Sequence, residues 1–188
     1  THEFAIGGPA FDLPWPPARN PWDTRRFTGG SSSGSGAAVA AGLALGALGS
    51  DTGGSIRLPA AYCGIAGIKP TPGLVSRRGV IPLAPSLDTA GPMAWTAMDC
   101  AILLDALAGH DPLDPASVSG PPVSYATAVA TPIRGLRVGM LRRFYEHDVP
   151  ASPEMLQMMS HAAATLRSLG CRVEDASLPS VQEYNAVG

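Results

Sequence analysis

Residues 29–55 constrain the fold of this chain more than any other segment. Twenty-one of these 27 residues are glycine, serine or alanine. Such a composition is typical of a flexible linker, but four aliphatic residues interrupt it, and the tract continues directly into the apolar segment 56–68. We therefore expect the small side chains to permit close packing of one backbone segment against another.

This tract is predicted to hold a short helix followed by a buried strand. Residues 35–41 favour a helix that Gly42 interrupts, and residues 44–50 favour a strand. Periodicity alone does not separate a helix from a strand in such short apolar runs.

Outside the tract, proline and capping signals divide the chain. Thr96 and Asp99 have the spacing of a capping box for a helix that ends at Gly109. Five prolines within residues 110–132 predict a long surface loop.

Residues 9–22 carry five more prolines and two tryptophans, which predict an extended arm with its indoles packed on the body. A polyproline ligand is the alternative.

The C-terminal part of the sequence predicts a strand, a helix and a second strand. Residues 136–141 form the first strand, Ser152 caps a helix that ends at Gly170, and residues 171–178 return as a strand. The core stripe of this helix is Leu156, Met159, Ala163 and Leu166. Because a strand–helix–strand unit brings its strands together in parallel, at least part of the sheet is expected to be parallel.

The composition places the chain among ordinary globular proteins. Its 188 residues are 45% hydrophobic and 15% charged, with a formal net charge of -2, which indicates one folded domain over residues 1–188. No apolar run approaches the roughly 20 residues of a membrane span, and the near-neutral charge gives no basic surface for nucleic acid. The expected fold class is α/β, with a mixed β-sheet core flanked by helices.

Three cysteines occur, at positions 63, 100 and 171. Their wide spacing and odd number fit neither a disulfide framework nor a zinc site. The sequence shows no metal-binding cluster and no nucleotide-binding motif, so we expect no metal and no cofactor. Because no secretory signal is visible at residues 1–5, we expect a cytoplasmic protein in a reducing compartment.

Only three charged residues occur between Thr28 and Ser76, namely Asp51, Arg57 and Lys69. A charge in such an apolar segment has to be paired or hydrogen-bonded. We therefore expect Asp51 to be held by backbone amides or by one of the two cations. A supporting ion pair is the plainer interpretation of Asp51 and Arg57, and a structural charge that of Lys69.

The segment from Thr52 to Ser55 has the composition of an anion cradle. Gly53 and Gly54 let the backbone approach a ligand closely. A helix that starts near Ile56 would turn the four amides of this segment toward one point, suited to a developing oxyanion. Ser55 would then stand at the mouth of the cradle as a nucleophile. The alternative is that Ser55 is an ordinary helix N-cap.

Two other motifs in the glycine–serine tract are incomplete. The run Gly29–Gly36 lacks the Lys-Ser/Thr pair of a phosphate-binding loop. Gly30-x-Ser32-x-Gly34 matches the nucleophile-elbow pattern. However, the four histidines of the chain stand in no recognisable catalytic context, which argues against a Ser-His-Asp hydrolase.

Three ordered segments together resemble the amidase signature family. They are Gly29-Gly-Ser-Ser-Ser-Gly-Ser-Gly36, Gly49-Ser-Asp-Thr-Gly-Gly-Ser-Ile-Arg57 and Cys63-Gly-Ile-Ala-Gly-Ile-Lys-Pro-Thr71. The segment Ser86-Leu-Asp-Thr-Ala-Gly-Pro92 and the helix at 96–109 also fit. The resemblance is strong from about Phe4 to Gly109 and weaker from there to the end.

The resemblance implies a Ser-Ser-Lys triad. Ser55 matches the nucleophile, and Ser31 matches a middle serine that follows a cis peptide bond and passes a proton between the nucleophile and a neutral lysine. The amides of residues 52–55 would hold the oxyanion, ammonia or an amine would leave, and water would hydrolyse the acyl-enzyme. Positions that brace the loops are matched by Ser32, Asp51 and Arg57.

The resemblance also implies that part of the domain is missing. The family's lysine lies upstream of the serine-rich loop, and Lys69, the only lysine here, matches a non-catalytic position. We therefore expect residues 1–188 to be a fragment of one amidase signature domain, incomplete at both ends and without appreciable activity by itself. The implied partner is a small-molecule amide substrate, with no membrane; a homo-oligomer is left open.

Two other functions are consistent with the same motifs. One is the A subunit of a glutamine-dependent aminoacyl-tRNA amidotransferase, which uses ammonia from glutamine to amidate a charged tRNA and would add a nucleic-acid partner. The arm at residues 9–22 favours the stand-alone amidase over that alternative. The other is a non-catalytic binding protein that retains the fold without the lysine.

Overall fold

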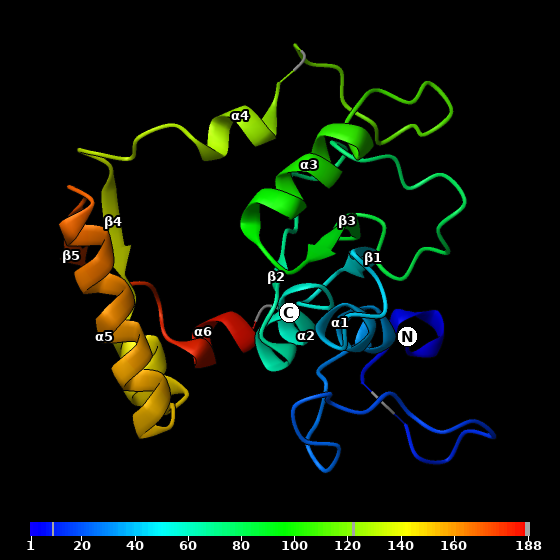
Figure 1. Cartoon of the computed structure of the whole chain (residues 1–188), viewed down its shortest axis with the longest axis horizontal. Helices are drawn as coiled ribbons and strands as arrows, with labels where there is room; N and C mark the ends of the chain where they lie inside the picture. Colours follow the sequence, from blue (N-terminus) through cyan, green and yellow to red (C-terminus); the bar gives the residue numbers. More distant parts are fainter. Residues whose placement is uncertain (9, 122, 187–188) are drawn as a thin grey trace. The chain divides into compact units, whose positions relative to one another are not determined.

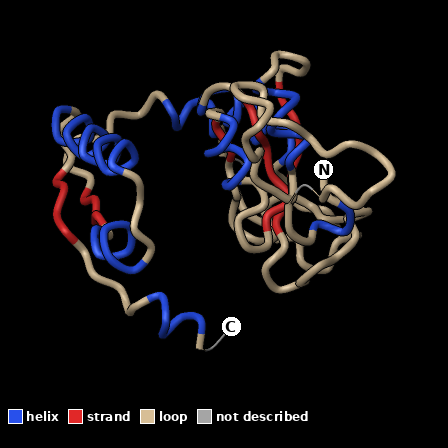
Figure 2. The backbone as a smooth tube through the Cα atoms, turned by 90° about the horizontal axis from the view of Figure 1, so that it is seen from below, coloured by secondary structure: helices blue, strands red, loops and turns tan. Residues whose placement is uncertain are grey.

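The structure, a computed structural model, describes residues 1–8, 10–121 and 123–186. These residues belong to two compact units, Thr1–Ala130 and Thr131–Gly188, whose elements are drawn in Figures 1 and 2. Pro9 of the predicted arm and Pro122 of the predicted loop lie outside the described residues. The assignment of residues 1–188 to a single domain stays a prediction.

The first unit is built on a three-stranded antiparallel sheet in the order β1-β3-β2. Its strands are β1 (Gly46–Asp51), β2 (Ala66–Gly67) and β3 (Thr89–Ala94). β1 pairs with β3 along its whole length, from Gly46 opposite Ala94 to Asp51 opposite Thr89. The strand predicted at 44–50 is therefore confirmed, and it extends to Asp51.

Three helices pack on this sheet: α1 (Ser33–Ala40), α2 (Arg57–Cys63) and α3 (Ala97–Leu107). α1 and α2 lie on one side of the sheet and α3 on the other (Figure 1). The helix predicted at 35–41 is confirmed as α1, which starts two residues earlier, and Gly42 follows its end with a φ of 71°.

α3 shows the predicted capping box. The Thr96 hydroxyl accepts from the Asp99 amide at 3.1 Å, and the Asp99 carboxylate accepts from the Thr96 amide at 3.2 Å. The helix ends before Gly109 as expected, but the chain leaves it in an extended conformation at Ala108 rather than through a left-handed glycine. Ala108 instead forms a β-bridge with Val75.

The N-terminal arm, which follows a short 3-10 turn (η1, Glu3–Ala5), is irregular as predicted. The side-chain amide of Asn20 holds it by donating to the carbonyls of Phe27 and Tyr62 at 3.1 and 2.8 Å. Trp22 donates to a backbone carbonyl, yet Trp22 and Trp15 keep 67% and 51% of their surfaces exposed. The prediction that the indoles pack on the body is confirmed for Trp22, whose ring meets that of Trp95 edge to face with the centroids 6.4 Å apart. Both indoles nevertheless stay at least half exposed, and a buried asparagine anchors the arm.

The predicted loop at 110–132 contains a short helix, α4 (Tyr125–Val129). Ser124 caps it by accepting from the Thr127 amide at 3.3 Å. The carboxylate of Asp105 on α3 accepts from the Ser124 hydroxyl and the Ala126 amide, both at 3.2 Å. The loop prediction is therefore wrong over these residues, because a cap and a carboxylate from another helix stabilise one helical turn.

The second unit is the predicted strand–helix–strand arrangement. β4 (Arg137–Met140) pairs in parallel with β5 (Arg172–Asp175), and α5 (Pro153–Ser168) connects them. A π-helical turn (η2, Phe144–Asp148) precedes α5, and α6 (Val181–Asn185) follows β5. The second strand is shorter than the predicted 171–178.

α5 begins and ends at the predicted residues. Ser152 accepts from the Met155 amide at 3.3 Å, and Gly170 follows the helix with a φ of 89°. Ala163 is the most buried residue of the predicted stripe, at 1% exposure, and the other three members are half-buried. The stripe is therefore confirmed as the packing face.

Candidate active site

Two segments of the glycine–serine tract, residues 28–33 and 49–57, are joined directly by hydrogen bonds. The Ser32 amide donates to the Ser55 carbonyl at 3.2 Å. The Ser32 hydroxyl accepts from the Ser50 amide at 3.3 Å and lies 3.4 Å from the Ser50 carbonyl, to which it donates. The segment that carries Ser31 therefore lies against the backbone that carries Ser55.

Ser31 is buried, with 2% of its surface exposed, and follows a cis peptide bond with Gly30, as the resemblance implies. Gly30 packs on the backbone of a third segment, residues 7–8. A Cβ on Gly30 would lie 2.5 Å from the Cα of Gly8, closer than real side chains approach. This contact is the close backbone packing that the small-residue tract predicts.

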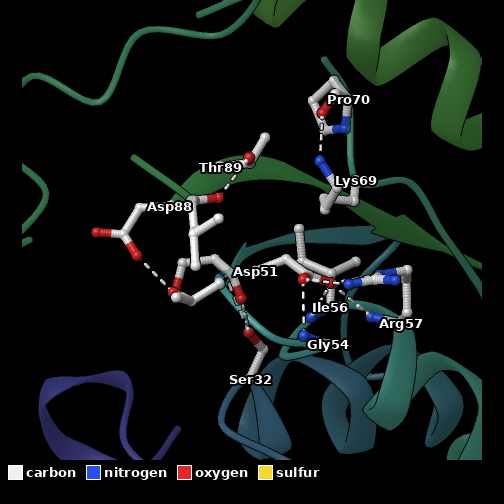
Figure 3. Close-up of polar contacts among 12 residues, drawn as sticks. Ser32, Asp51, Gly54, Ile56, Arg57, Lys69, Pro70, Asp88 and Thr89 are labelled. Carbon is white, nitrogen blue, oxygen red and sulfur yellow. Dashed lines mark hydrogen bonds and ion pairs between the residues drawn. The ribbon is translucent and has the colours of Figure 1, made fainter. Parts of the chain in front are cut away.

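Asp51 is fully buried at the end of β1 and organises the turn that leads into α2 (Figure 3). Its carboxylate accepts from the backbone amides of Gly54, Ile56 and Arg57 at 2.8, 3.1 and 3.2 Å. The Arg57 guanidinium adds two further bonds, at 3.0 and 2.8 Å. The expectation that amides or a cation hold Asp51 is confirmed, since both do.

The protonation of Asp51 follows from these contacts. Burial acts to raise its pKa, but the hydrogen bonds from the Arg57 side chain and from the Ile56 and Arg57 amides outweigh burial and hold the pKa below its ordinary value. Asp51 is therefore a fixed anion whose oxygens are occupied by donors, which suits a brace rather than a base.

Ile56 connects this brace to the sheet. Its side chain is fully buried and packs on one glycine from each of the three strands. A Cβ added to any of these glycines would lie within 3.1 Å of an Ile56 carbon. These glycines are Gly49 in β1, Gly67 in β2 and Gly91 in β3. Because Ile56 directly follows Ser55, this glycine floor fixes the backbone of Ser55.

The segment of the predicted anion cradle, Thr52–Ser55, lies in the same turn. The N-cap of α2 is Ile56, without a side-chain cap, so the alternative that Ser55 caps this helix is wrong. The Gly54 amide donates to Asp51, whereas the amides of Gly53 and Ser55 have no acceptor among the described residues. The use of all four amides as an oxyanion hole stays a prediction.

A pocket of about 430 Å³ opens at Ser55. Ser55, Thr52, Gly53 and Gly30 line it. The rest of its lining is apolar or glycine: Ala5, Ile6, Gly7, Gly8, Phe27, Leu58 and Leu83. The structure thus brings part of the predicted site to one cavity. The other predicted site residues do not line it: Ser31, Ser32, Asp51, Gly54 and Arg57.

Two further charged residues, Lys69 and Asp88, lie near the site. The Lys69 ammonium donates to the Pro70 carbonyl at 3.1 Å and is directed away from Asp51 (Figure 3), as a structural charge would be. Asp88, at 6% exposure, accepts from the Thr52 hydroxyl and was missed from the sequence. The signal was available, because Asp88 is the only charged residue between Arg78 and Asp99.

Side chains that could ligate a metal are dispersed in the described part of the chain. No group of three or more His, Cys, Asp or Glu side chains there could hold a metal ion. The three cysteines are buried thiols. Among the same residues, no helix is long and apolar enough to cross a membrane.

A comparison with known families agrees with the geometry of the site. The model of the family described as Amidase matches residues 1–187. The chain belongs to the Amidase family. Among curated Amidase-family relatives, the A subunit of the glutamyl-tRNA(Gln) amidotransferase from Moorella thermoacetica is 47% identical over 96% of this chain.

Solved structures of the Amidase family share the fold. The crystal structure of the A subunit of the glutamyl-tRNA(Gln) amidotransferase from Thermotoga maritima matches 94% of this chain at 42% identity, with a TM-score of 0.87. The peptide amidase from Stenotrophomonas maltophilia matches 89% at 41% identity, with a TM-score of 0.80. The chain spans only 37%, 38% and 34% of the lengths of these three relatives.

Proposed function

We propose that the protein carrying this chain hydrolyses a carboxamide C–N bond, with Ser55 as the nucleophile. The observation that carries the proposal is the junction of the two glycine–serine segments, where the Ser32 amide donates to the Ser55 carbonyl beside an open pocket. Membership of the Amidase family supports the same reaction.

In the proposed mechanism, the Ser55 hydroxyl oxygen attacks the amide carbonyl carbon. Its proton passes to the Ser31 hydroxyl, and Ser31 gives its own proton to a neutral amine base. Collapse of the tetrahedral intermediate breaks the C–N bond as the leaving nitrogen takes up the proton. Water then attacks the acyl-enzyme, which releases a carboxylate and restores Ser55.

The developing negative charge needs donors aimed at the carbonyl oxygen. The amides of Gly53 and Ser55, which lack another acceptor among the described residues, suit this role, and we place that of Thr52 with them. The Gly54 amide, which the family resemblance also assigns to the oxyanion hole, already donates to Asp51. Ser32, Asp51 and Arg57 act as braces for the turn. Because Lys69 is engaged with Pro70, the amine base of the Ser-Ser-Lys triad is proposed to come from sequence outside residues 1–188.

A second candidate is the A subunit of an amidotransferase, which the curated relatives of 45–49% identity favour. The two candidates share amide hydrolysis at Ser55 and differ in the fate of the ammonia. Glutaminase activity stimulated by tRNA and dependent on partner subunits would select the amidotransferase. Turnover of simple amides by the isolated protein would select the amidase. The buried thiols of the chain fit a reducing, cytoplasmic location for either.

The direct test is labelling with a serine-reactive fluorophosphonate in the complete protein that carries these residues. We expect the wild type to be labelled and Ser55→Ala to lose both the label and amide turnover. Ser33→Ala, which removes a buried hydroxyl from α1 outside the pocket, is the matched control and should keep both. Labelling and turnover that persist in Ser55→Ala would disprove the assignment.

A further inference from the structure

Asp88 is a buried carboxylate at the start of β3 that gathers donors from two parts of the chain. Its oxygens accept from the Leu83 amide at 2.8 Å and from the Ala84 amide at 2.9 and 3.1 Å. The same group accepts from the Thr52 hydroxyl at 2.5 Å (Figure 3). One side chain therefore joins the 83–84 turn to the Thr52–Ser55 segment.

Two of the three residues that donate to the Asp88 carboxylate line the pocket. Leu83 forms part of its apolar wall, and Thr52 lines it beside Ser55. Asp88 itself is absent from the lining, so it reaches the cavity only through these neighbours. A shift of the Asp88 carboxylate would therefore move Leu83 in the pocket lining and Thr52 beside Ser55 at the same time.

The surroundings of Asp88 keep it ionised and in place. Burial acts to raise its pKa, but the hydrogen bonds from Thr52 and from the Ala84 and Leu83 amides, with the nearby charge of Arg77, hold the pKa below its ordinary value. The Arg77 guanidinium also donates to the Asp88 carbonyl at 3.1 Å. The position of Asp88 is therefore fixed by contacts to its carboxylate and to its backbone carbonyl.

We infer that Asp88 is a positioning residue that holds Thr52 of the anion cradle and the Leu83 wall of the pocket at a fixed separation. This inference rests on the proposed function, because it assigns Asp88 to the turnover of the acyl group at Ser55. Asp88 does not touch the substrate; it acts through Thr52 and Leu83.

The test compares Asp88→Asn with Asp114→Asn in the complete protein. Asp114 is a matched control, because it is also a buried carboxylate, at 8% exposure, and accepts from the Arg77 and Ala116 amides without contacting the pocket. An asparagine at 88 presents an NH2 group to at least one donor. We expect kcat to fall about 10- to 100-fold, since a small misplacement near the reacting atoms has that cost, with KM changing less. Asp114→Asn should change kcat less than about two-fold at a similar loss of Tm.

A second pair of variants keeps the inference testable if Asp88→Asn folds poorly. Thr52→Val removes the donor to Asp88 but keeps the backbone amide, and should lower kcat as Asp88→Asn does. Thr52→Ser restores a hydroxyl and should recover most of that loss. The kcat of the double variant Asp88→Asn/Thr52→Val should be no lower than that of the poorer single variant. The reason is that both substitutions disrupt the same hydrogen bond between Thr52 and Asp88.

Two results would overturn the inference: a kcat loss in Asp88→Asn no larger than in Asp114→Asn, or effects of Asp88→Asn and Thr52→Val that multiply. A failure of the proposed function is recognised separately, since Ser55→Ala would then keep its label and its turnover whatever the Asp88 variants do.

Discussion

The glycine–serine segments of the first unit and the strand–helix–strand unit at residues 131–188 are stabilised in different ways. In the second unit, α5 packs through one stripe centred on Ala163, and caps define its ends. Around Ser55, a buried carboxylate, Asp51, and a floor of glycines hold a turn that has no amphipathic pattern. The turn at Ser55 is therefore stabilised by hydrogen bonds and by glycines that allow close packing, whereas the second unit is stabilised by periodic apolar contacts.

The largest effect is expected for Ser31→Ala. Loss of the hydroxyl that we propose to transfer the proton should lower kcat by about 10³-fold, while the thermal unfolding midpoint stays near that of wild type. Ser160→Ala in α5 removes a hydroxyl that donates to the Leu156 carbonyl of the same helix and is the control from the other region. Equal turnover in the two variants, measured as steady-state amide hydrolysis, would remove Ser31 from the mechanism.

Asp51→Asn tests the buried brace. It leaves three amides and Arg57 with a poorer acceptor, and should lower the free energy of unfolding by about 3 kcal/mol at pH 7. Because the folded pKa of Asp51 lies below its unfolded value, this contribution is present above about pH 4 and is lost as the pH falls through the folded pKa.

Denaturant titrations of wild type and Asp51→Asn at pH 7, 5 and 3 measure this dependence. The difference between the two proteins should be constant from pH 7 to 5 and shrink at pH 3. A difference that grows on acidification would contradict the assignment of Asp51 as the ionised acceptor.

Gly49→Ala tests the glycine floor. The added Cβ would lie 2.7 Å from the Ser32 hydroxyl and 2.9 Å from an Ile56 carbon, so we expect a loss of about 2 kcal/mol in unfolding free energy together with lower turnover. Gly109→Ala, where a Cβ meets nothing within 4 Å, is the control. If both variants unfold at the same denaturant concentration, the floor is not tightly packed.

The smallest effect is expected in the second unit. Ser152→Ala removes the cap of α5 and should cost about 1 kcal/mol of stability, measured by denaturant unfolding, without a change in kcat. Ser152→Asp, which can also cap, should recover that loss. A fall in kcat for Ser152→Ala would show that the two regions do not have separate roles.

How far the sequence predicts the structure differs between the same two regions. The limits of α5 and the capping box at Thr96 follow from local signals, because caps and periodicity are properties of a few neighbouring residues. α4 was missed because its stabilising carboxylate, Asp105, lies 20 residues away from Tyr125 in the chain. The shortened β5 likewise depends on how far its partner β4 extends.

At the site, the family resemblance supplied the candidate residues, and the sequence did not show how they connect. A charged residue in a long apolar segment is expected to be paired or hydrogen-bonded, and this expectation was met at Asp51. Applied to residues 79–98, the same expectation would have singled out Asp88. Nothing local shows that the Ser32 amide donates to the Ser55 carbonyl, because the two residues are far apart in sequence. The extent to which the two indoles of the arm are buried was overestimated, because composition does not show which surface remains exposed.

The packing of Ile56 over three glycines has a consequence for changing what the protein accepts. Positions 49, 67 and 91 offer no room for new side chains, so a mutagenesis library there would mainly yield variants that misfold. Diversity introduced at Phe27 and Leu58, which line the cavity, would alter the shape of the cavity without adding side chains to the three glycines that pack against Ile56.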